Sequence, residues 1–146
     1  MLHRIQLSEI KDLQNKYETL DEKIEMEQED AIKSNLLMAF NYEYEGTNTS
    51  VNIDTSEFTA LCPWTGLPDF GSIYINYIPN KLCIELKSLK YYLMTFTRVG
   101  IVQEHAANKI LKDLVICCDP VSMTVKLDYK VRGGIHTSVS CNYERN

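Results

Sequence analysis

Two predicted helices that follow each other directly constrain the fold more than any other feature of this sequence. Residues 85–97 and 103–118 both repeat apolar side chains at helical spacing, and Gly100 separates them. Asp119-Pro120 ends the second helix. Because the segments on both sides of this helical pair look like strands, the sequence predicts an α+β domain with both helices on one face of an antiparallel sheet.

The remaining periodic segments are short and bounded by turn residues, as strands are. Residues 36–45 and 51–55 look extended, and residues 71–78, 122–131 and 135–141 are typical of strands. The last two meet at Gly133-Gly134, a pair suited to a tight hairpin turn. We therefore expect a four-stranded antiparallel sheet whose two open edges are covered by neighbouring subunits in a homo-oligomer.

The N-terminal third has its own pattern. Apolar side chains recur every three or four residues in the predicted helical segment 5–33, at Ile10, Leu13, Tyr17, Leu20 and Ile24. A helix packed on its own domain or on a neighbouring subunit explains this stripe, and a partner-binding coiled coil is the alternative. The sequence thus predicts an N-terminal helical extension at residues 1–35 and a sheet-and-helix domain at residues 36–146.

Composition limits the class of protein. The formal net charge is −5, which argues against a direct nucleic-acid partner. The chain holds no apolar run of the roughly 18 residues that span a bilayer, and its charged N-terminus does not resemble a secretory signal, so we expect a cytoplasmic protein. Five widely spaced cysteines favour reduced thiols, and the sequence has no local cysteine and histidine spacing that predicts a metal site.

One thiol stands in a constrained segment. Two prolines and a glycine make residues 58–69 a shaped loop, with Cys62 near its start and Asp69 at its end. If the loop folds back, a carboxyl group would lie near a nucleophilic thiolate and could deliver a proton to the anion that forms after attack. On spacing alone, a buried core thiol remains the competing explanation.

Two motifs carry a family resemblance. The stretch Leu-Cys-Pro-Trp-Thr-Gly-Leu-Pro-Asp-Phe at residues 61–70, followed by Glu-Leu-Lys-Ser-Leu-Lys-Tyr-Tyr at residues 85–92, resembles the paired motifs of 7-cyano-7-deazaguanine reductases, the QueF family. The resemblance covers about residues 51–141. It implies the tunnelling fold (T-fold), in which four-stranded sheets of several subunits close into a β-barrel. Rings of subunits, among them two stacked pentamers, are the assemblies it suggests.

The resemblance also implies a reaction. The enzyme would reduce the nitrile of 7-cyano-7-deazaguanine to 7-aminomethyl-7-deazaguanine in queuosine biosynthesis, a tRNA modification pathway. Cys62 would attack the nitrile carbon to form a thioimide, and Asp69 would protonate the nitrogen. Reduction of a nitrile to an amine takes four electrons, so two NADPH molecules would each donate a hydride.

Other site residues follow from the same resemblance. Glu104 corresponds to a glutamate that recognises the purine edge, and its acceptor-only carboxylate suits adjacent N–H donors. Gln103 precedes it where many family members have histidine, so this position keeps hydrogen-bonding groups but lacks a titratable group for a proton relay. The segment that lines the substrate site is Ile84, Glu85 and Leu86, and the candidates for the NADPH phosphates are Lys87, Lys90 and Arg132.

Rival functions are less well supported. A related amidinotransferase would act on the same nitrile within tRNA, and the motif at residues 85–92 and the acidic net charge disfavour it. A non-catalytic purine- or pterin-binding protein of the same fold has no need of Cys62 paired with Asp69. A zinc-dependent cyclohydrolase of this fold would need a ligand set that the cysteines and histidines do not supply.

Overall fold

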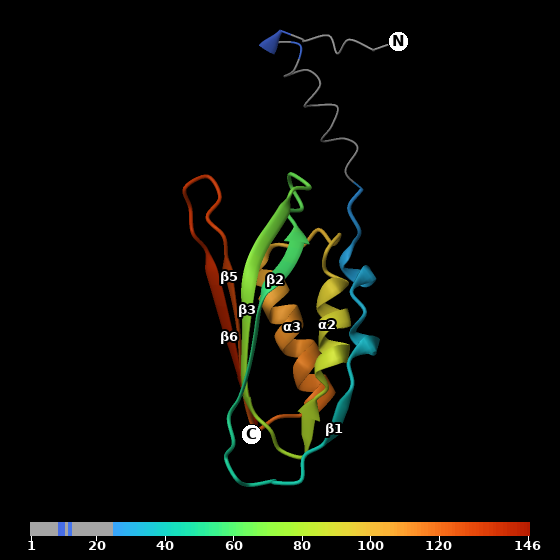
Figure 1. Cartoon of the computed structure of the whole chain (residues 1–146), viewed down its shortest axis with the longest axis vertical. Coiled ribbons are helices and arrows are strands. Elements are labelled where there is room, and N and C mark those ends of the chain that lie inside the picture. Colours follow the sequence, from blue (N-terminus) through green and yellow to red (C-terminus); the bar gives the residue numbers. More distant parts are fainter. Residues whose placement is uncertain (1–8, 11, 13–24) are drawn as a thin grey trace, which may run out of the picture.

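A computed structural model describes residues 9, 10, 12 and 25–146 of the chain (Figure 1). Short 3₁₀ helices η1 (Glu29–Ala31) and η2 (Ser34–Leu36) precede the strands β1 (Ala39–Asn41), β2 (Val51–Leu61), β3 (Pro68–Ile78) and β4 (Leu82–Ile84). The helices α2 (Leu86–Met94) and α3 (Gln103–Cys118) follow, and then the strands β5 (Ser122–Tyr129) and β6 (Ser138–Glu144). No helix in this described part has the length and apolar character needed to cross a membrane.

The main sheet is antiparallel, with the strand order β2-β3-β5-β6. It consists of two hairpins, β2-β3 and β5-β6, and both helices cover one of its faces (Figure 1). The α+β architecture expected from the sequence is therefore confirmed. Among the described residues, the outer edge of β6 has no strand partner, and the outer edge of β2 has none apart from the isolated bridge between Leu61 and Gly100.

Two boundary predictions were wrong. Residues 36–45 do not join the main sheet, because only Ala39–Asn41 is extended and it pairs with β4 in a separate two-stranded sheet. The segment 58–69 is not a loop throughout: β2 runs to Leu61, which pairs with Pro68 at the start of β3. Pro68 is tolerated there because a proline at the first residue of a strand does not interrupt the hydrogen-bond ladder. The loop therefore contains only residues 62–67.

The predicted N-terminal helix lies largely outside the described residues. Where its C-terminal part is described, at residues 25–33, the chain forms an isolated parallel bridge from Glu27 to Val99 and then the 3₁₀ helix η1. The helix therefore does not reach Lys33 as expected.

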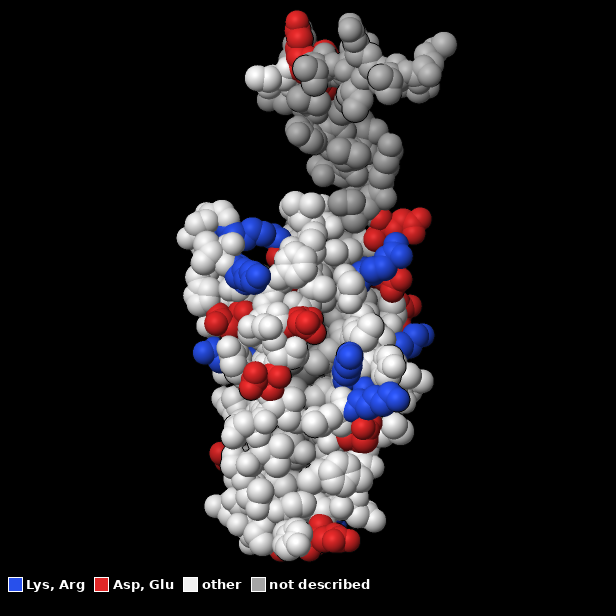
Figure 2. All heavy atoms as spheres, viewed as in Figure 1, with Lys and Arg blue, Asp and Glu red and all other residues white. Residues whose placement is uncertain are grey.

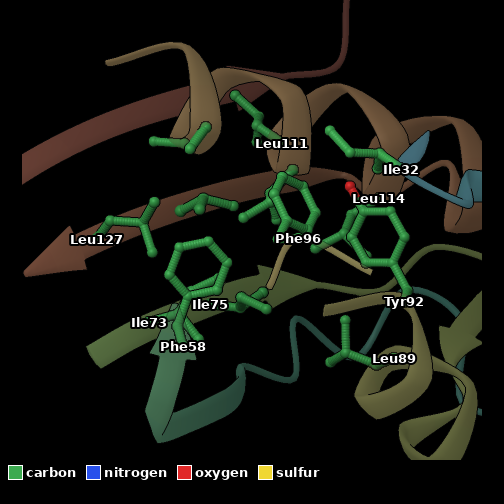
Figure 3. Close-up of a cluster of buried hydrophobic side chains, with 14 of the residues drawn as sticks. Ile32, Phe58, Ile73, Ile75, Leu89, Tyr92, Phe96, Leu111, Leu114 and Leu127 are labelled. Atoms are coloured by element: carbon green, nitrogen blue, oxygen red, sulfur yellow. The ribbon is translucent and has the colours of Figure 1, made fainter. Parts of the chain in front are cut away.

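Aromatic rings join the helices to the sheet (Figure 3). Phe96 follows α2, and its ring centroid lies 5.5 Å from that of Phe58 on β2 and 5.5 Å from that of Tyr92 on α2. All three side chains are fully buried. Ile73 and Ile75 of β3 project from the sheet into the same cluster. This packing holds the two helices against one face of the sheet. The candidate site lies outside it, at the end of β2 and the start of β3.

A buried carboxylate connects the two helices, and its removal should weaken the fold. The hydroxyl of Tyr92 donates to Asp113 Oδ2 at 2.7 Å, and Lys109 Nζ donates to Asp113 Oδ1 at 3.0 Å. Replacing Asp113 with alanine leaves the buried Tyr92 hydroxyl without its acceptor, so we expect the free energy of unfolding in urea to fall by about 2–4 kcal/mol. Removing the exposed ion pair to Asp119 by Arg145→Ala should cost less than about 1 kcal/mol. Equal losses in the two variants would contradict this account.

Candidate active site

Cys62 opens a six-residue loop that is held by its own backbone. The Cys62 N–H donates to the Leu67 carbonyl at 2.9 Å, and the Gly66 N–H donates to the Cys62 carbonyl at 2.8 Å. Gly66 has a φ of 71°, a left-handed conformation that favours glycine. The Pro-Trp-Thr-Gly sequence therefore turns the chain directly after Cys62 and fixes the position of the thiol.

A second set of backbone bonds holds the start of this loop from the side. The Leu61 N–H donates to the Val99 carbonyl at 2.9 Å, and the Ile101 N–H donates to the Leu61 carbonyl at 3.1 Å. The same connecting segment pairs on its other side with Glu27, whose carbonyl accepts from Gly100 N–H at 2.9 Å. Three stretches distant in sequence thus form a short ladder beside Cys62, with the segment between α2 and α3 in the middle.

The Cys62 sulfur lies in polar surroundings although little of it is exposed. The residue is 6% exposed. Burial opposes ionisation of the thiol, but hydrogen bonds from the side chain and backbone of Thr65, from Arg132 and from the Trp64 backbone together lower its pKa to about 7. A thiol with a lowered pKa forms the nucleophilic thiolate more readily than an ordinary cysteine does.

Asp69 and Arg132 meet beside this thiol. Asp69 is the second residue of β3 and is 8% exposed. Arg132 begins the turn between β5 and β6, where Gly133 and Gly134 both have positive φ, at 60° and 78°. The Arg132 guanidinium Nη1 donates to Asp69 Oδ1 in an ion pair. The loop after β2 and the turn after β5 lie at the same end of the sheet, uppermost in Figure 1.

Glu104 belongs to the same end of the molecule. It lies in the first turn of α3, and its side chain is exposed, while Gln103 is half-buried. Burial and then the carboxylates of Asp69 and Glu104 raise the pKa of Tyr129, so both acids lie near that ring. His105, also exposed, follows in the same helical turn.

Neither Thr65 nor Tyr129 was predicted from the sequence as a site residue. Thr65 lies within the Cys62 motif, so its place three residues after the thiol was an available signal. Tyr129 is the last residue of β5 and pairs with Gly71, two residues beyond Asp69. The pairing of Tyr129 with Gly71 follows from the register of β3 and β5, and it cannot be predicted from the spacing of residues in the sequence.

The segment Ile84, Glu85 and Leu86 lies far from Cys62 within one chain. The Ile84 N–H donates to the Tyr77 hydroxyl at 3.0 Å. Tyr77 is eight residues beyond Asp69 on β3, which corresponds to roughly 26 Å at about 3.3 Å per residue. One bicyclic ligand does not contact both places in the same subunit.

Glu85 is the N-cap of α2. Its carboxylate accepts from the backbone N–H groups of Lys87 at 2.9 Å and Ser88 at 2.7 Å. The Ser88 bond and then the Lys87 bond lower the pKa of Glu85. Both carboxylate oxygens therefore already accept bonds that begin the helix, whereas the sequence suggested that this side chain contacts the substrate.

A groove of about 530 Å³ runs between α2 and the edge strand β2. Its walls are largely apolar, with Leu86, Leu89 and Leu93 on the helix side and Ile53 on the strand side. Lys90 also lines it, and Lys87 is exposed nearby on the same helix. The three candidate phosphate ligands are thus divided, because Lys87 and Lys90 lie on α2 while Arg132 lies beside Cys62 and Asp69.

Comparisons with known proteins agree on one family. A family model described as "QueF-like protein" matches residues 68–146. An "NADPH-dependent 7-cyano-7-deazaguanine reductase" of Chloroherpeton thalassium is 50% identical over 113 residues, covering 77% of this chain and 97% of the relative. A reductase of the same name from Chlorobaculum tepidum is 47% identical over 111 residues, covering 76% of this chain and 95% of the relative.

A solved structure shares the fold. The crystal structure of "the archaeosine synthase QueF-Like in the apo form" aligns with a TM-score of 0.60 over 64% of this chain and 91% of that chain. Because the two sequences are only 18% identical, this likeness supports the α+β architecture alone.

Proposed function

This chain belongs to the QueF-like protein family, and we propose that it is an NADPH-dependent reductase that converts 7-cyano-7-deazaguanine to 7-aminomethyl-7-deazaguanine in queuosine biosynthesis. The observation that carries the proposal is the Cys62 thiol, whose pKa is about 7, beside the buried Asp69. The relatives are named for a nitrile substrate. Because a nitrile carbon is electrophilic, an enzyme that acts on it in this way needs a nucleophile such as the Cys62 thiolate.

Cys62 and Asp69 have different roles in the first chemical step. The Cys62 thiol passes its proton to the Asp69 carboxylate, the thiolate forms the sulfur–carbon bond as one carbon–nitrogen π bond breaks, and Asp69 returns the proton to the nitrogen. The net result is addition of S–H across the nitrile, which gives a thioimide without a leaving group. Covalent attachment to Cys62 would retain the substrate through the first hydride transfer, and the carbon–sulfur bond would then break to leave an imine, which the second hydride would reduce to the amine.

Two lysines of α2 fit the phosphates of NADPH. Lys87 and Lys90 are exposed and three residues apart, so they lie on neighbouring positions of one helix face. In the described part of the chain neither has an ion-pair partner. NADPH, when bound, supplies the hydride, and two molecules are needed for each nitrile. The lysines would position the cofactor, while the active site excludes water from the thioimide.

We infer that a second copy of the chain completes the substrate site. Ile84 and Leu86 lie too far from Cys62 to contact the same ligand within one subunit. The free edges of β2 and β6, together with the apolar groove beside β2, favour sheet extension between copies. Closure of such a sheet into the β-barrel of the tunnelling fold would bring residues 84–86 of one subunit to the Cys62 end of its neighbour.

Glu104 and Gln103 are proposed to bind the purine edge, and the charge of Glu104 should matter for affinity. Glu104→Gln replaces one acceptor oxygen with a donor, so the Kd of the nitrile should rise roughly tenfold to a hundredfold. Titration calorimetry with the nitrile alone measures this Kd. Glu29→Gln, an exposed acid in η1, is the matched control and should leave the Kd unchanged. An unchanged Kd in Glu104→Gln would show that Glu104 does not bind the purine edge.

The proposed activity is tested by mixing the protein, the nitrile and NADPH without RNA. We expect two NADPH to be oxidised for each amine formed, followed by nicotinamide absorbance and by mass spectrometry of the product. An amidinotransferase would instead require tRNA that carries the nitrile and would leave NADPH unoxidised. A purine- or pterin-binding protein would do neither. The face in Figure 2, with acidic and basic side chains interspersed, offers no broad basic surface for RNA.

A further inference from the structure

Residues 98–101 form a connector between α2 and α3 that reaches two parts of the candidate site. Backbone hydrogen bonds of 2.9 and 3.1 Å pair the connector with Leu61, which directly precedes Cys62. The last residue of the connector, Ile101, lies three residues before Glu104 in the first turn of α3. A shift of the connector would therefore move the thiol and the carboxylate proposed to bind the purine edge relative to each other.

Residues 26–27 form an N-terminal anchor on the opposite side of the connector. The Glu27 N–H donates to the Arg98 carbonyl at 2.8 Å, and the Glu27 carbonyl accepts from the Gly100 N–H at 2.9 Å. The half-buried Met26 side chain lies over Gly100, so a Cβ at position 100 would overlap Met26 Sδ and lie 2.7 Å from Met26 Cγ. The anchor thus holds the connector through backbone bonds and through the packing of Met26.

Gly100 lacks a side chain where Met26 needs room, and its backbone does not require glycine. Its φ lies outside the left-handed region, unlike that of Gly66, so other residues could adopt this conformation. Val99 and Ile101 on either side are 0% and 4% exposed, so the connector cannot move inward to make room for a side chain at position 100. An added methyl group would have to displace Met26, and with it the anchor.

We propose that Met26 and Gly100 are positioning residues, whose close contact keeps the anchor on the connector and thereby fixes Cys62 relative to Glu104. The effect on turnover rests on the proposed function, but the effect on the anchor and on the thiol does not. Without the anchor, the backbone of the connector would be paired on one side only, and the groups that now bond Glu27 would lose their partners. A displacement of roughly 1 Å between a nucleophile and its target can slow a reaction about a hundredfold.

A double-variant cycle at positions 26 and 100 tests the proposal. Gly100→Ala places a methyl group where Met26 lies, so kcat of NADPH oxidation per folded protein should fall roughly tenfold to a hundredfold. Amide hydrogen exchange across the connector, measured by peptide mass spectrometry, should become faster. Met26→Ala alone should have a smaller effect, because Glu27 keeps its backbone bonds. In the double variant the methyl group has room, so both measurements should return to the values of Met26→Ala.

Glu25→Gln is the matched control. It breaks the exposed ion pair of 3.4 Å between Glu25 and Arg98, next to the anchor, and adds no bulk beside Gly100. Because exposed ion pairs contribute little, amide exchange and kcat should stay as in the unchanged protein. Losses equal to those of Gly100→Ala would show that any change near the anchor disturbs the site, and the specific role of the Met26 contact would be overturned. Urea unfolding establishes conditions in which every variant is folded.

The remaining outcomes also decide the proposal. Unchanged kcat in folded Gly100→Ala protein would mean that the anchor does not position the site. An equal loss of kcat with methionine and with alanine at position 26 would mean that the methyl group does not act through Met26. If the unchanged protein oxidises no NADPH, the proposed function fails, and the same cycle is measured by the rate of Cys62 alkylation with iodoacetamide. We expect faster alkylation in Gly100→Ala, because Cys62 is 6% exposed and a shifted loop uncovers it, and recovery in the double variant.

Discussion

Cys62→Ala protein is expected to lose nitrile reduction by at least about a thousand-fold while it still binds the nitrile. The thiolate forms the bond that activates the nitrile carbon, and no other described cysteine shares its environment. Burial raises the pKa of Cys118 to about 12 and raises the pKa of Cys117 and Cys141 above the ordinary range. The loss should appear in the rate of NADPH oxidation, with the Kd of the nitrile changed little.

The matched control for this variant is Cys141→Ala. Cys141 lies on β6, is half-buried and is also a free thiol. Its replacement should leave the reduction rate nearly unchanged. Substantial activity in Cys62→Ala, or equal losses in both variants, would show that the nucleophile lies elsewhere. Circular dichroism and urea unfolding establish that both proteins are folded, so that a loss of activity can be assigned to the sulfur.

Asp69→Asn is expected to slow turnover by about a hundredfold to ten-thousandfold while the covalent adduct still forms. Asparagine has nearly the same shape and keeps an acceptor for Arg132, but it cannot deliver a proton to the nitrile nitrogen. Since the pKa of Cys62 is lowered to about 7, the thiolate can form near neutral pH without Asp69 as a base. Without this proton donor the adduct should form more slowly but to nearly its full amount, with water as the proton source, and turnover should be slow.

Two measurements on Asp69→Asn separate these roles. Intact-mass spectrometry without NADPH follows the adduct, and single-turnover NADPH oxidation follows the reduction that comes after it. We expect nearly full adduct together with slow oxidation. Complete failure to form the adduct, in a protein that is folded and binds the nitrile, would mean that Asp69 does more than donate a proton.

The sequence predicted the helices, the antiparallel order and the turn at Gly133-Gly134, because periodicity and turn chemistry are local properties. It missed the true ends of β2 and β3, since a strand end depends on its partner as well as on its own residues. The Cys62 motif also suggested that the chain returns after the thiol, and the six-residue hairpin loop does bring Asp69 opposite Ala60, two residues before Cys62.

Other parts of the site could not be read from the chain. Arg132 lies 63 residues from Asp69, and only the pairing of β3 with β5 brings the two together. The segment 84–86 looked like part of the same pocket, but the length of β3 separates it from Cys62. The N-cap role of Glu85 was not predicted, although it depends on local sequence: a carboxylate just before a helix accepts bonds from the first N–H groups of that helix.

The most direct test is to incubate the protein with the nitrile in the absence of NADPH and to measure its intact mass. A thioimide retains every atom of the nitrile, so we predict one added nitrile mass per chain, located by peptide mapping at Cys62. Adduct formation should become faster as the pH rises through about 7, because the thiolate is the attacking form. A chain that reduces the nitrile without this added mass, or that carries it on another cysteine, would contradict the account.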